Sequence, residues 1–377
     1  MPKLRFPEFN IEWEKKKLGD IVDFYKGKGI SREDLSDNGT PCILYGELYT
    51  TYGEIIDNVV SKTNLDIDFF MSKANDIIIP SSGETAEDIS CASAVLLDNI
   101  ALGGDLNVLR PKENIDGSFL SFALNFAKKY DIAKVAQGAS IVHVYADSLK
   151  QLYINVPSLQ EQQKITNFLS TINSRIKTQE KKIENIEEMK KGFMQKIFSQ
   201  EIRFKDKNGE EYPEWEEKKL ENIVELITSN LSIANALSNG QYLLYDANGI
   251  IGKTDKKVGL QYISIIKDGA GVGRLRLLEE DTYFIGTMNG FISYTENIKF
   301  LYYFLNQMDF KKYVVGSGIP HIYFKDYKTE KFRIPILEEQ EKIANFLSLF
   351  DEKIETEKKI LEVLQEIKKG LLQQMFV

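Results

Sequence analysis

The feature that most constrains the fold of this chain is an internal repeat, because a duplicated segment builds the same structure twice. The stretch Glu12-Trp13-Glu14-Lys15-Lys16-Lys17-Leu18 recurs 202 residues later as Glu214-Trp215-Glu216-Glu217-Lys218-Lys219-Leu220. A second stretch, 157–198, recurs at 335–376 with an offset of 178. The region between these anchors is therefore 24 residues shorter in the second half. The two halves share their ends and differ in their middles.

Composition sets the class of protein and excludes several kinds of chemistry. The chain has 377 residues, of which 43% are hydrophobic and 28% charged, as in soluble globular proteins. It has no apolar run of membrane-spanning length and no apolar leader, so we expect a cytoplasmic protein without a membrane partner. Two cysteines and two histidines are too few for the usual zinc site or a disulfide framework.

The repeated closing segments predict two long helices whose apolar residues form a heptad seam. With Ile165 and Ile343 at position a, eight of ten a and d positions in the first copy are apolar, and both copies have polar residues at the same two places. A helix of this length needs a partner along the seam. The residues expected to pair the helices are Ile172, Ile176, Ile183, Ile186, Lys190, Phe193, Phe350, Ile354, Glu357, Leu361, Leu364, Lys368 and Leu371.

The polar seam residues favour an antiparallel pair. In that arrangement Gln179 meets Lys368 and Lys190 meets Glu357, whereas a parallel pair would place Lys190 beside Lys368. The expected apolar contacts are Ile183 with Leu364 and Ile186 with Leu361. The alternative is that each helix packs only on its own globular domain.

The variable middles predict two α/β domains. In the first, we expect strands at 42–45, 76–79, 94–97 and 106–109 and one helix over 118–135. In the second, we expect strands at 242–245, 262–266, 273–277 and 282–285 and one helix over 298–314. The expected domains are 1–157, 158–200, 201–335 and 336–377, and a polar connector, 206–213, separates the halves.

Catalytic motifs are imitated but incomplete. Residues 247–254 resemble a phosphate-binding loop, yet Ala247 replaces the first glycine and no helix pattern follows. The glycines of 269–273 suggest a dinucleotide loop, but a returning strand follows, so a hairpin turn is the better interpretation. The chain lacks the Asn/Asp-Pro-Pro-aromatic tetrapeptide of amino-methyltransferases. His143 and His321 occupy equivalent places without an equivalent nucleophile, so a loop-structural or polar contact role is expected.

Several of these segments together resemble a known family. They are 203–215, the pair of segments from Pro157 and Pro335, and Lys267-Asp268-Gly269-Ala270-Gly271-Val272-Gly273. They look like the DNA-specificity (S) subunit of type I restriction-modification enzymes, and the likeness spans nearly the whole chain. It implies two target-recognition domains that alternate with two long helices paired as an antiparallel coiled coil, with a pseudo-twofold internal repeat.

The resemblance also implies a function. Each target-recognition domain would read one half of a bipartite sequence in double-stranded DNA, and the paired helices would set the gap between the halves. The helices would also dock methyltransferase (modification) subunits, expected to be two, and restriction/translocase subunits would join them. S-adenosylmethionine, ATP and Mg would then be bound by those partner subunits, and this chain would hold no cofactor and no metal and would not be an enzyme.

Base-contacting residues cannot be transferred from the family, so we select them by chemistry. Polar, cationic and glycine-rich loops allow close approach to phosphates and base edges. In the first domain the candidates are Lys26, Lys28, Ser31, Arg32, Tyr45, Ser81, Ser82, Ser140 and His143. In the second they are Ser229, Asn230, Tyr245, Asn248, Lys253, Arg274, Asn289, Ser317 and His321. For each one the alternative is a solvated turn residue.

The overall charge bears on DNA binding. The net charge is −8 and the pI is about 5.2, whereas phosphate neutralisation dominates affinity for DNA. We therefore expect weak DNA binding by the isolated chain, with partners supplying part of the positive charge. Two other functions stay open: an adenine-specific DNA methyltransferase with its own recognition domains, and a coiled-coil scaffold that binds only proteins.

Overall fold

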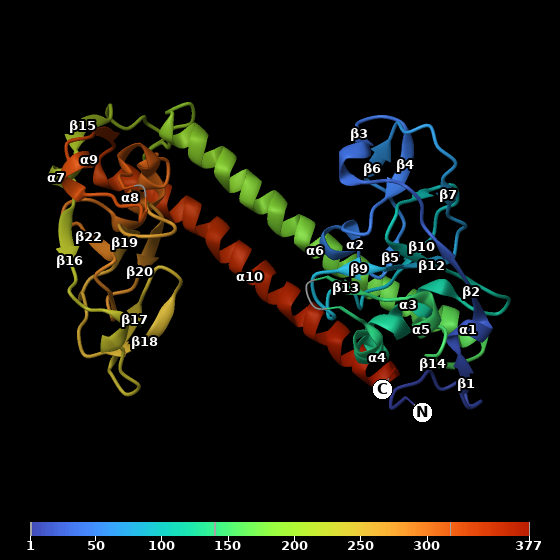
Figure 1. The fold of residues 1–377 in the computed structure, drawn as a ribbon. Coiled ribbons are helices and arrows are strands. Elements are labelled where there is room, and N and C mark those ends of the chain that lie inside the picture. The colour runs from blue at the N-terminus through green and yellow to red at the C-terminus, as the bar shows by residue number, and fades with distance from the viewer. Residues whose placement is uncertain (1, 139–140, 317, 377) are drawn as a thin grey trace. The chain divides into compact units, whose positions relative to one another are not determined.

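The computed structural model describes residues 2–138, 141–316 and 318–376, which form two compact units. Unit 1 contains residues 2–180 and 360–376, and unit 2 contains residues 181–359. Each unit combines one α/β domain with about half of each of two long helices; Figure 1 labels the elements. Within the described residues, no helix has both the length and the apolar character needed to cross a membrane.

The first domain is built from short strands and helices. Its strands are β1 (Glu14–Lys17), β2 (Val22–Lys26), β3 (Leu35–Ser36), β4 (Thr40–Ile43), β5 (Ile55–Ile56), β6 (Ser61–Thr63), β7 (Phe70–Met71), β8 (Asp76–Pro80), β9 (Ser82–Gly83), β10 (Ser93–Val95), β11 (Ala101–Leu102), β12 (Leu106–Pro111), β13 (Val142–His143) and β14 (Tyr153–Val156). Its helices are α1 (Leu18–Ile21), the 3-10 helix η1 (Arg32–Asp34), α2 (Glu47–Thr50), α3 (Gly117–Phe126), α4 (Lys129–Val135) and α5 (Ala146–Leu149).

The second domain has fewer strands. They are β15 (Glu216–Lys219), β16 (Glu225–Thr228), β17 (Tyr242–Tyr245), β18 (Ile250–Thr254), β19 (Tyr262–Ile266), β20 (Leu275–Leu278), β21 (Thr282–Phe284), β22 (Met288–Ile292) and β23 (Lys331–Ile334). Its helices are α7 (Leu220–Ile223), η2 (Ile233–Asn235), α8 (Ile298–Leu305), η3 (Phe310–Tyr313) and α9 (Phe324–Tyr327).

Sheet topology shows that the repeat extends into the divergent middles. The main sheet of the first domain has the order β2-β12-β8-β10-β5, and that of the second has the order β16-β22-β19-β20. The outer pairs β1-β14 and β15-β23 also correspond. The smaller sheet differs, with β3-β6-β4-β11-β7 in the first domain and only β18-β17-β21 in the second. The shorter second middle thus has fewer strands in this smaller sheet.

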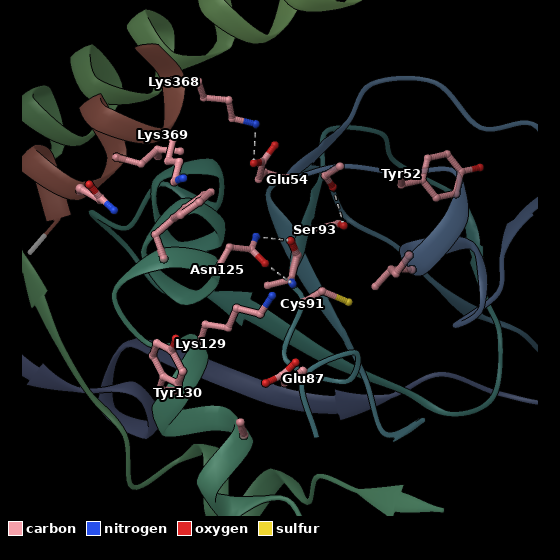
Figure 2. A pocket seen from close by; sticks show the side chains of 17 residues that line it. Tyr52, Glu54, Glu87, Cys91, Ser93, Asn125, Lys129, Tyr130, Lys368 and Lys369 are labelled. Carbon is pink, nitrogen blue, oxygen red and sulfur yellow. Dashed lines mark hydrogen bonds and ion pairs between the residues drawn. The ribbon is translucent and has the colours of Figure 1, made fainter. Parts of the chain in front are cut away.

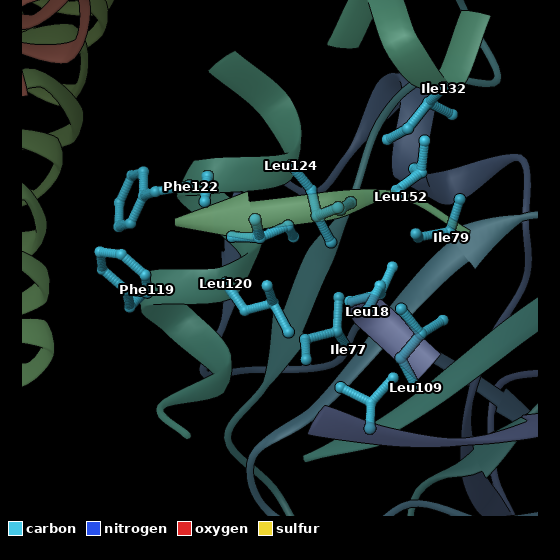
Figure 3. Packing of buried hydrophobic residues seen from close by; sticks show 14 of the residues in the cluster. Leu18, Ile77, Ile79, Leu109, Phe119, Leu120, Phe122, Leu124, Ile132 and Leu152 are labelled. Atoms are coloured by element: carbon cyan, nitrogen blue, oxygen red, sulfur yellow. The ribbon is translucent and has the colours of Figure 1, made fainter. Parts of the chain in front are cut away.

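The core of the first domain lies where α3 covers the main sheet. Ile77 and Ile79 of β8 belong to the cluster in Figure 3, together with Phe119 and Leu120 of α3. Ile78 belongs to a second cluster instead. Because successive strand residues point to opposite faces, β8 is buried on both sides, which explains its continuous run of isoleucines.

The helices after each main sheet are shorter than predicted. The helix expected over 118–135 is two helices, α3 and α4, and the one expected over 298–314 is α8 followed by η3. Tyr130, which lies in α4 just after the break, is 79% exposed. Both first helices begin at an N-cap that local sequence explains: Asp116 accepts a hydrogen bond from the backbone of Phe119, and Asn297 accepts one from that of Phe300.

The two imitations of nucleotide-binding loops are β-hairpins. Residues 267–274 connect the antiparallel strands β19 and β20, as predicted. Residues 246–249 connect β17 and β18, and β18 (Ile250–Thr254) takes up the second part of the motif, where a phosphate-binding segment would have to be a loop leading into a helix.

The repeated closing segments form two 40-residue helices, α6 (Leu159–Phe198) and α10 (Leu337–Phe376). All the residues predicted to pair them are buried or half-buried, as are the remaining a and d positions. Most other side chains of the central turns are exposed. The heptad pattern therefore identified the shielded face of each helix correctly.

The helices are antiparallel, because each unit contains the beginning of one and the end of the other. In unit 2, the ring of Phe193 lies 5.2 Å from that of Phe346 and 5.6 Å from that of Phe350. In unit 1, residues of both helices, Leu169 and Met375 among them, are buried in one cluster with the first domain. The helices thus pair with each other and also pack on the domains.

The predicted pairing of charged layers is wrong in register. Lys190 was expected to meet Glu357, but its Nζ lies 2.5 Å from Asp351, while Glu357 pairs with Lys182 at 2.7 Å. Asp351 also accepts a hydrogen bond from Tyr303 of α8, and Lys190 lies over the ring of Tyr303. Lys368, expected to meet Gln179, pairs with Glu54 of the first domain at 2.7 Å. The α/β domains thus supply partners for both seam lysines.

A repeated clamp fastens each domain to the start of a long helix. Glu161 in the first turn of α6 accepts two hydrogen bonds from Arg5, at 2.8 and 2.7 Å, and one from Trp13 at 3.2 Å. The same arrangement joins Glu339 of α10 to Arg203 at 3.3 and 2.8 Å and to Trp215 at 3.1 Å. We call these two groups of three residues the N-terminal clamps. Each glutamate thus joins the first turn of a long helix to the segment at the start of its own domain.

Candidate nucleic-acid interface

The loops at one edge of the first domain's main sheet are tied together by backbone hydrogen bonds. Ser81, which follows β8, donates its N–H to Asp105 at 2.7 Å and accepts from Val144 at 3.1 Å. Gly27, which follows Lys26 at the end of β2, donates to Leu106 at 2.9 Å. The edge therefore gathers the ends of β2 and β8, the start of β12 and the segment around β13.

Tyrosines and a histidine extend this edge. The hydroxyl of Tyr49 donates to the backbone oxygen of Ser82 at 2.8 Å, and the ring of Tyr45 lies 6.3 Å from that of Tyr49. His143 pairs with Ser82 through β13 and β9, and its ring is stacked on Tyr145 at 6.2 Å. The structure thus brings together Lys26, Tyr45, Ser81, Ser82 and His143 from the predicted set.

Burial and pairing divide these candidates by role. Ser81 and Ser82 are only 7% and 8% exposed, so their side chains support the loop rather than face solvent. Lys28 forms an exposed ion pair with Asp68 at 2.9 Å. Ser31 and Asp34 form the capping box of η1, which contains the exposed Arg32. Ser140 lies outside the described residues.

The corresponding edge of the second domain has the same connections. Ser229 and Asn230 follow β16, and Leu231 accepts from Gly286 at 2.7 Å. Lys267 follows β19; it donates its backbone N–H to Thr287 at 3.0 Å and accepts from Ile322 at 2.9 Å. Asn289 lies on β22 opposite Thr228, as Asn107 lies opposite Lys26 in the first domain. Asn289 is 5% exposed, and its Oδ1 has no hydrogen-bond partner.

His321 is the most highly connected candidate at this edge. Its Nδ1 lies 2.8 Å from Oδ1 of Asp268, and Lys267 lies 2.8 Å from Oδ2 of the same carboxylate. The ring is stacked on Tyr323 at 6.4 Å, as His143 is on Tyr145. Ser317 lies outside the described residues.

A second group of candidates surrounds the hairpin turn after β17. The guanidinium group of Arg274 donates to the backbone oxygen of Ala247, and Arg276 lies over the ring of Tyr245 at 5.5 Å. The backbone of Asn248 donates to Asp246 at 2.7 Å, and its side chain is exposed. Lys253 lies exposed on β18, where its backbone pairs with Leu237. Tyr245, Asn248 and Arg274 are therefore grouped.

Sequence reasoning missed the residues that partner the histidines. Tyr145 and Tyr323 are 55% and 48% exposed and both follow the pattern His-x-Tyr, which the repeat shows at an offset of 178. That pattern could have been found. No comparable signal in the sequence points to the contacts of Asp268 and Arg276, because each contact joins segments that are distant in sequence.

A cavity lined by described residues lies elsewhere in unit 1. It has a volume of about 660 Å³ and lies between α3, α4 and the last turns of α10 (Figure 2). Glu54 and Lys368 form their ion pair at its wall, and Asn125 bonds the backbone of Ala92. Burial raises the pKa of Cys91, which also lines it, to about 12. Such a thiol is a poor nucleophile at neutral pH.

Among the described residues no cluster of three or more His, Cys, Asp or Glu side chains could hold a metal.

Comparison with known proteins adds a family to this geometry. The family model for the type I restriction modification DNA specificity domain matches residues 10–188 and 212–366. The MjaVIII type I restriction enzyme specificity subunit of Methanocaldococcus jannaschii is 27% identical over 99% of this chain and 93% of its own length. A putative type I specificity subunit of Mycoplasma genitalium is 25% identical over 100% of this chain and 96% of its own.

Solved structures share the fold. The crystal structure of the S subunit of a type I restriction-modification system from M. genitalium has a TM-score of 0.67 at 21% identity, over 100% of this chain and 99% of that one. A chain from a structural study of complex assembly and conformational transition in the type I restriction-modification system has a TM-score of 0.57 at 15% identity, over 98% of each chain. Two similar domains alternating with long helices are thus a fold that solved proteins also adopt.

Proposed function

Because the chain belongs to the family of type I restriction-modification DNA specificity proteins, whose members recognise DNA targets, we propose that it is the non-catalytic subunit that reads a bipartite sequence. Each α/β domain reads one half of the target. The paired helices set the gap between the halves and dock methyltransferase subunits, two in number. Restriction and translocase subunits complete the complex.

One observation carries the proposal: the two domains share a scaffold but differ in the side chains at their loop edges. The main sheets, the N-terminal clamps and the His-x-Tyr segments correspond. At the edges, however, Ser82 stands where the second domain has Asp268, and Lys26 stands where it has Thr228. A shared scaffold with different polar groups is what two readers of different half-sites need, because base edges are distinguished by donor and acceptor pattern.

The charge of the chain supports a role within a complex. With 48 basic against 56 acidic residues, a net charge of −8, the chain has no surplus of cations to neutralise phosphates. We propose that the methyltransferase subunits add phosphate contacts and bind S-adenosylmethionine, and that the translocase subunits bind ATP and Mg. A gel shift of the isolated chain should show weak binding that disappears between roughly 50 and 200 mM salt, the range over which phosphate contacts lose affinity. Tight, salt-tolerant binding would contradict this division.

Methylome sequencing tests the function directly. Cells with and without the chain are compared, each with the methyltransferase subunits present. We expect loss of one bipartite motif that is methylated at adenine on both strands. A matched control is a chain with Asp281→Asn, which removes one exposed carboxylate that pairs with Lys257 and should retain the motif. If no motif depends on the chain, the proposed function is wrong.

The scaffold and methyltransferase alternatives give different results. A scaffold that binds only proteins would affect complex formation without changing which sequence is methylated. A methyltransferase would be labelled when S-adenosylmethionine is photo-crosslinked to the purified chain. We expect no labelling of this chain and labelling of its partner in the complex.

A further inference from the structure

The carboxylate beside His321 determines which atoms of the imidazole can donate. Burial by itself would raise the pKa of Asp268, but hydrogen bonds from His321 and Lys267 outweigh it and lower the pKa below its ordinary value. Asp268 is therefore ionised at neutral pH and can only accept hydrogen bonds. The Nδ1 atom of His321, 2.8 Å from Oδ1, must then carry the hydrogen. In the neutral ring this leaves Nε2 with a free lone pair.

The backbone holds this pair of side chains from both sides. His321 and Val315 exchange two backbone hydrogen bonds of 2.8 and 2.9 Å, and Ile322 donates to Lys267 at 2.9 Å. Asp268 donates its backbone N–H to Thr287 at 3.2 Å. Because both residues are fixed through their main chains, the orientation of the imidazole is preorganised rather than selected on binding.

The ring is also accessible and supported on one face. The side chain of His321 is 34% exposed, so a ligand can reach it. Tyr323 stacks on it at 6.4 Å and is 48% exposed, and Lys325 lies over the ring of Tyr323 at 5.2 Å. A polar atom presented beside an exposed aromatic ring and a cation suits the edge of a nucleic-acid base.

We propose that Asp268 is a positioning residue that holds His321 as the Nδ1–H tautomer, so that Nε2 accepts a hydrogen bond from the exocyclic amino group of one base in the second half-site. This inference rests on the proposed function. In the major groove, adenine N6 and cytosine N4 present such donors, whereas guanine and thymine present acceptors. His321 thus favours adenine or cytosine at one position.

The first domain lacks this device. Ser82 occupies the place of Asp268 opposite His143, so no carboxylate from that strand orders the His143 ring. Among the residues that the structure describes, no hydrogen bond to the His143 ring fixes its tautomer, and we expect the first domain to discriminate less sharply at its equivalent base. The two readers therefore differ in selectivity as well as in sequence.

The test uses the complex of the full chain with its methyltransferase subunits. Once the motif is known, methylation rates are measured on duplexes that carry each of the four bases at every position of both half-sites. The half-site read by the second domain is the one unaffected by His143→Ala. The variants are Asp268→Asn, His321→Gln and the double variant. Asp281→Asn, which removes an exposed carboxylate that pairs with Lys257, is the matched control.

The expected result is confined to one base. An asparagine at 268 can either accept from Nδ1 through its amide oxygen or donate to Nδ1 through its amide nitrogen, so it no longer fixes the ring hydrogen on Nδ1, and Nε2 is a donor in part of the molecules. Discrimination for adenine or cytosine at that base should fall about tenfold, while all other positions and Asp281→Asn stay unchanged. In the His321→Gln background Asp268→Asn should have no further effect, because the group it positions is absent.

A pH profile separates positioning from simple structural support. Protonation of the imidazole converts Nε2 into a donor, so discrimination by the wild type should be lost at acidic pH once the ring is protonated, whereas His321→Gln should give a flat profile. The groups that face the ring are Asp268, Lys267 and Tyr323, with Lys325 beyond.

Several outcomes would overturn the inference. They are unchanged discrimination in Asp268→Asn, equal loss of methylation for all bases, equal pH profiles for wild type and His321→Gln, or an additive double variant. Absence of any chain-dependent motif would instead contradict the proposed function, so the two failures are distinguishable. If Asp268→Asn does not fold, His321→Gln and the pH profile still decide.

Discussion

At the scale of single residues, the N-terminal clamps explain why each half opens and closes with the same sequence. The side chains of Glu161 and Glu339 are only 2% and 1% exposed, so each carboxylate depends on its arginine and tryptophan partners. Those partners come from segments far away in sequence. The repeat thus conserves both members of a buried ion pair, which is costly to break when one partner is lost.

Removing one clamp arginine should therefore destabilise its unit. For Arg203→Ala we expect the free energy of unfolding of unit 2 to fall by about 3 kcal/mol, because Glu339 is left buried without its cation. Urea denaturation followed by circular dichroism measures this. The control is Lys331→Ala, whose exposed ion pair with Glu217 should contribute less than about 1 kcal/mol. Equal effects of the two substitutions would contradict the assignment.

The raised pKa of Cys91 predicts slow alkylation. With a pKa of about 12, due mainly to burial, the thiol is almost fully protonated at pH 8, with a thiolate fraction of about 10⁻⁴. Labelling by iodoacetamide should be far slower than for a free cysteine and should rise about tenfold per pH unit up to pH 10. Mass spectrometry of the labelled peptide measures it. Labelling as fast as in the urea-unfolded chain would show that the thiol is not shielded.

The candidate site could be predicted only in part, for reasons that differ among residues. The pairs His143–Tyr145 and His321–Tyr323 are visible in the repeat, because each pair is local in sequence. The pairing of Ser31 with Asp34 also follows from a local capping spacing. Asp268, however, reaches His321 across 53 residues, and only the antiparallel packing of loops brings them together.

At the scale of elements, heptad counting located the shielded face of both long helices but not their register. Apolar periodicity reports which side of a helix is covered, and every a and d position was indeed covered. The register also depends on which polar side chains pair with one another. Tyr303 of the second domain bonds Asp351, and Glu54 of the first domain pairs with Lys368. A prediction that considers only the two helices leaves out these partners from the domains.

The elements of the α/β domains were also predicted only in part. The strands expected at 242–245 and 262–266 match β17 and β19, because both are short runs dominated by aromatic and aliphatic residues, with Ser264 as the one polar member. The single helices expected over 118–135 and 298–314 were wrong, since each apolar pattern continues across a break in the helix. At Ala127 and Lys128 the chain changes direction between α3 and α4, and no glycine or proline marks that break.

A charge placed in the seam should separate the helices. Ile186 is 6% exposed, so Ile186→Asp would bury an unpaired carboxylate. Because a buried charge without a partner is costly, the free energy of unfolding should fall by about 3 kcal/mol or more. Asn185→Asp puts the same group at the neighbouring exposed position and should change stability by less than about 0.5 kcal/mol. Thermal unfolding by circular dichroism compares them, and similar melting temperatures would contradict the role of the seam.

At the scale of the whole molecule, the proposal makes helix length a measure of the gap in the target. Inserting one heptad into the middle of α6 and one into the middle of α10 lengthens each helix by about 10 Å. The gap in the methylated motif should then grow by about three base pairs, since ten base pairs occupy about 34 Å. Methylome sequencing reads the new gap. An insertion in α6 alone mismatches the seam and should abolish methylation, whereas an unchanged gap in the double insertion would contradict the proposal.

The mixed composition of unit 1 has a consequence for synthesis on the ribosome. The ring of Phe376 lies 5.5 Å from that of Phe119, and Leu372 and Met375 belong to the same core. Unit 2 is one continuous stretch and is complete once residue 359 has been made, whereas the first domain, translated before it, still needs residues 360–376. A premature stop codon near residue 360 would therefore destabilise the first domain more than the second, and the exposed apolar core of the first domain would be bound by chaperones and cleaved by proteases.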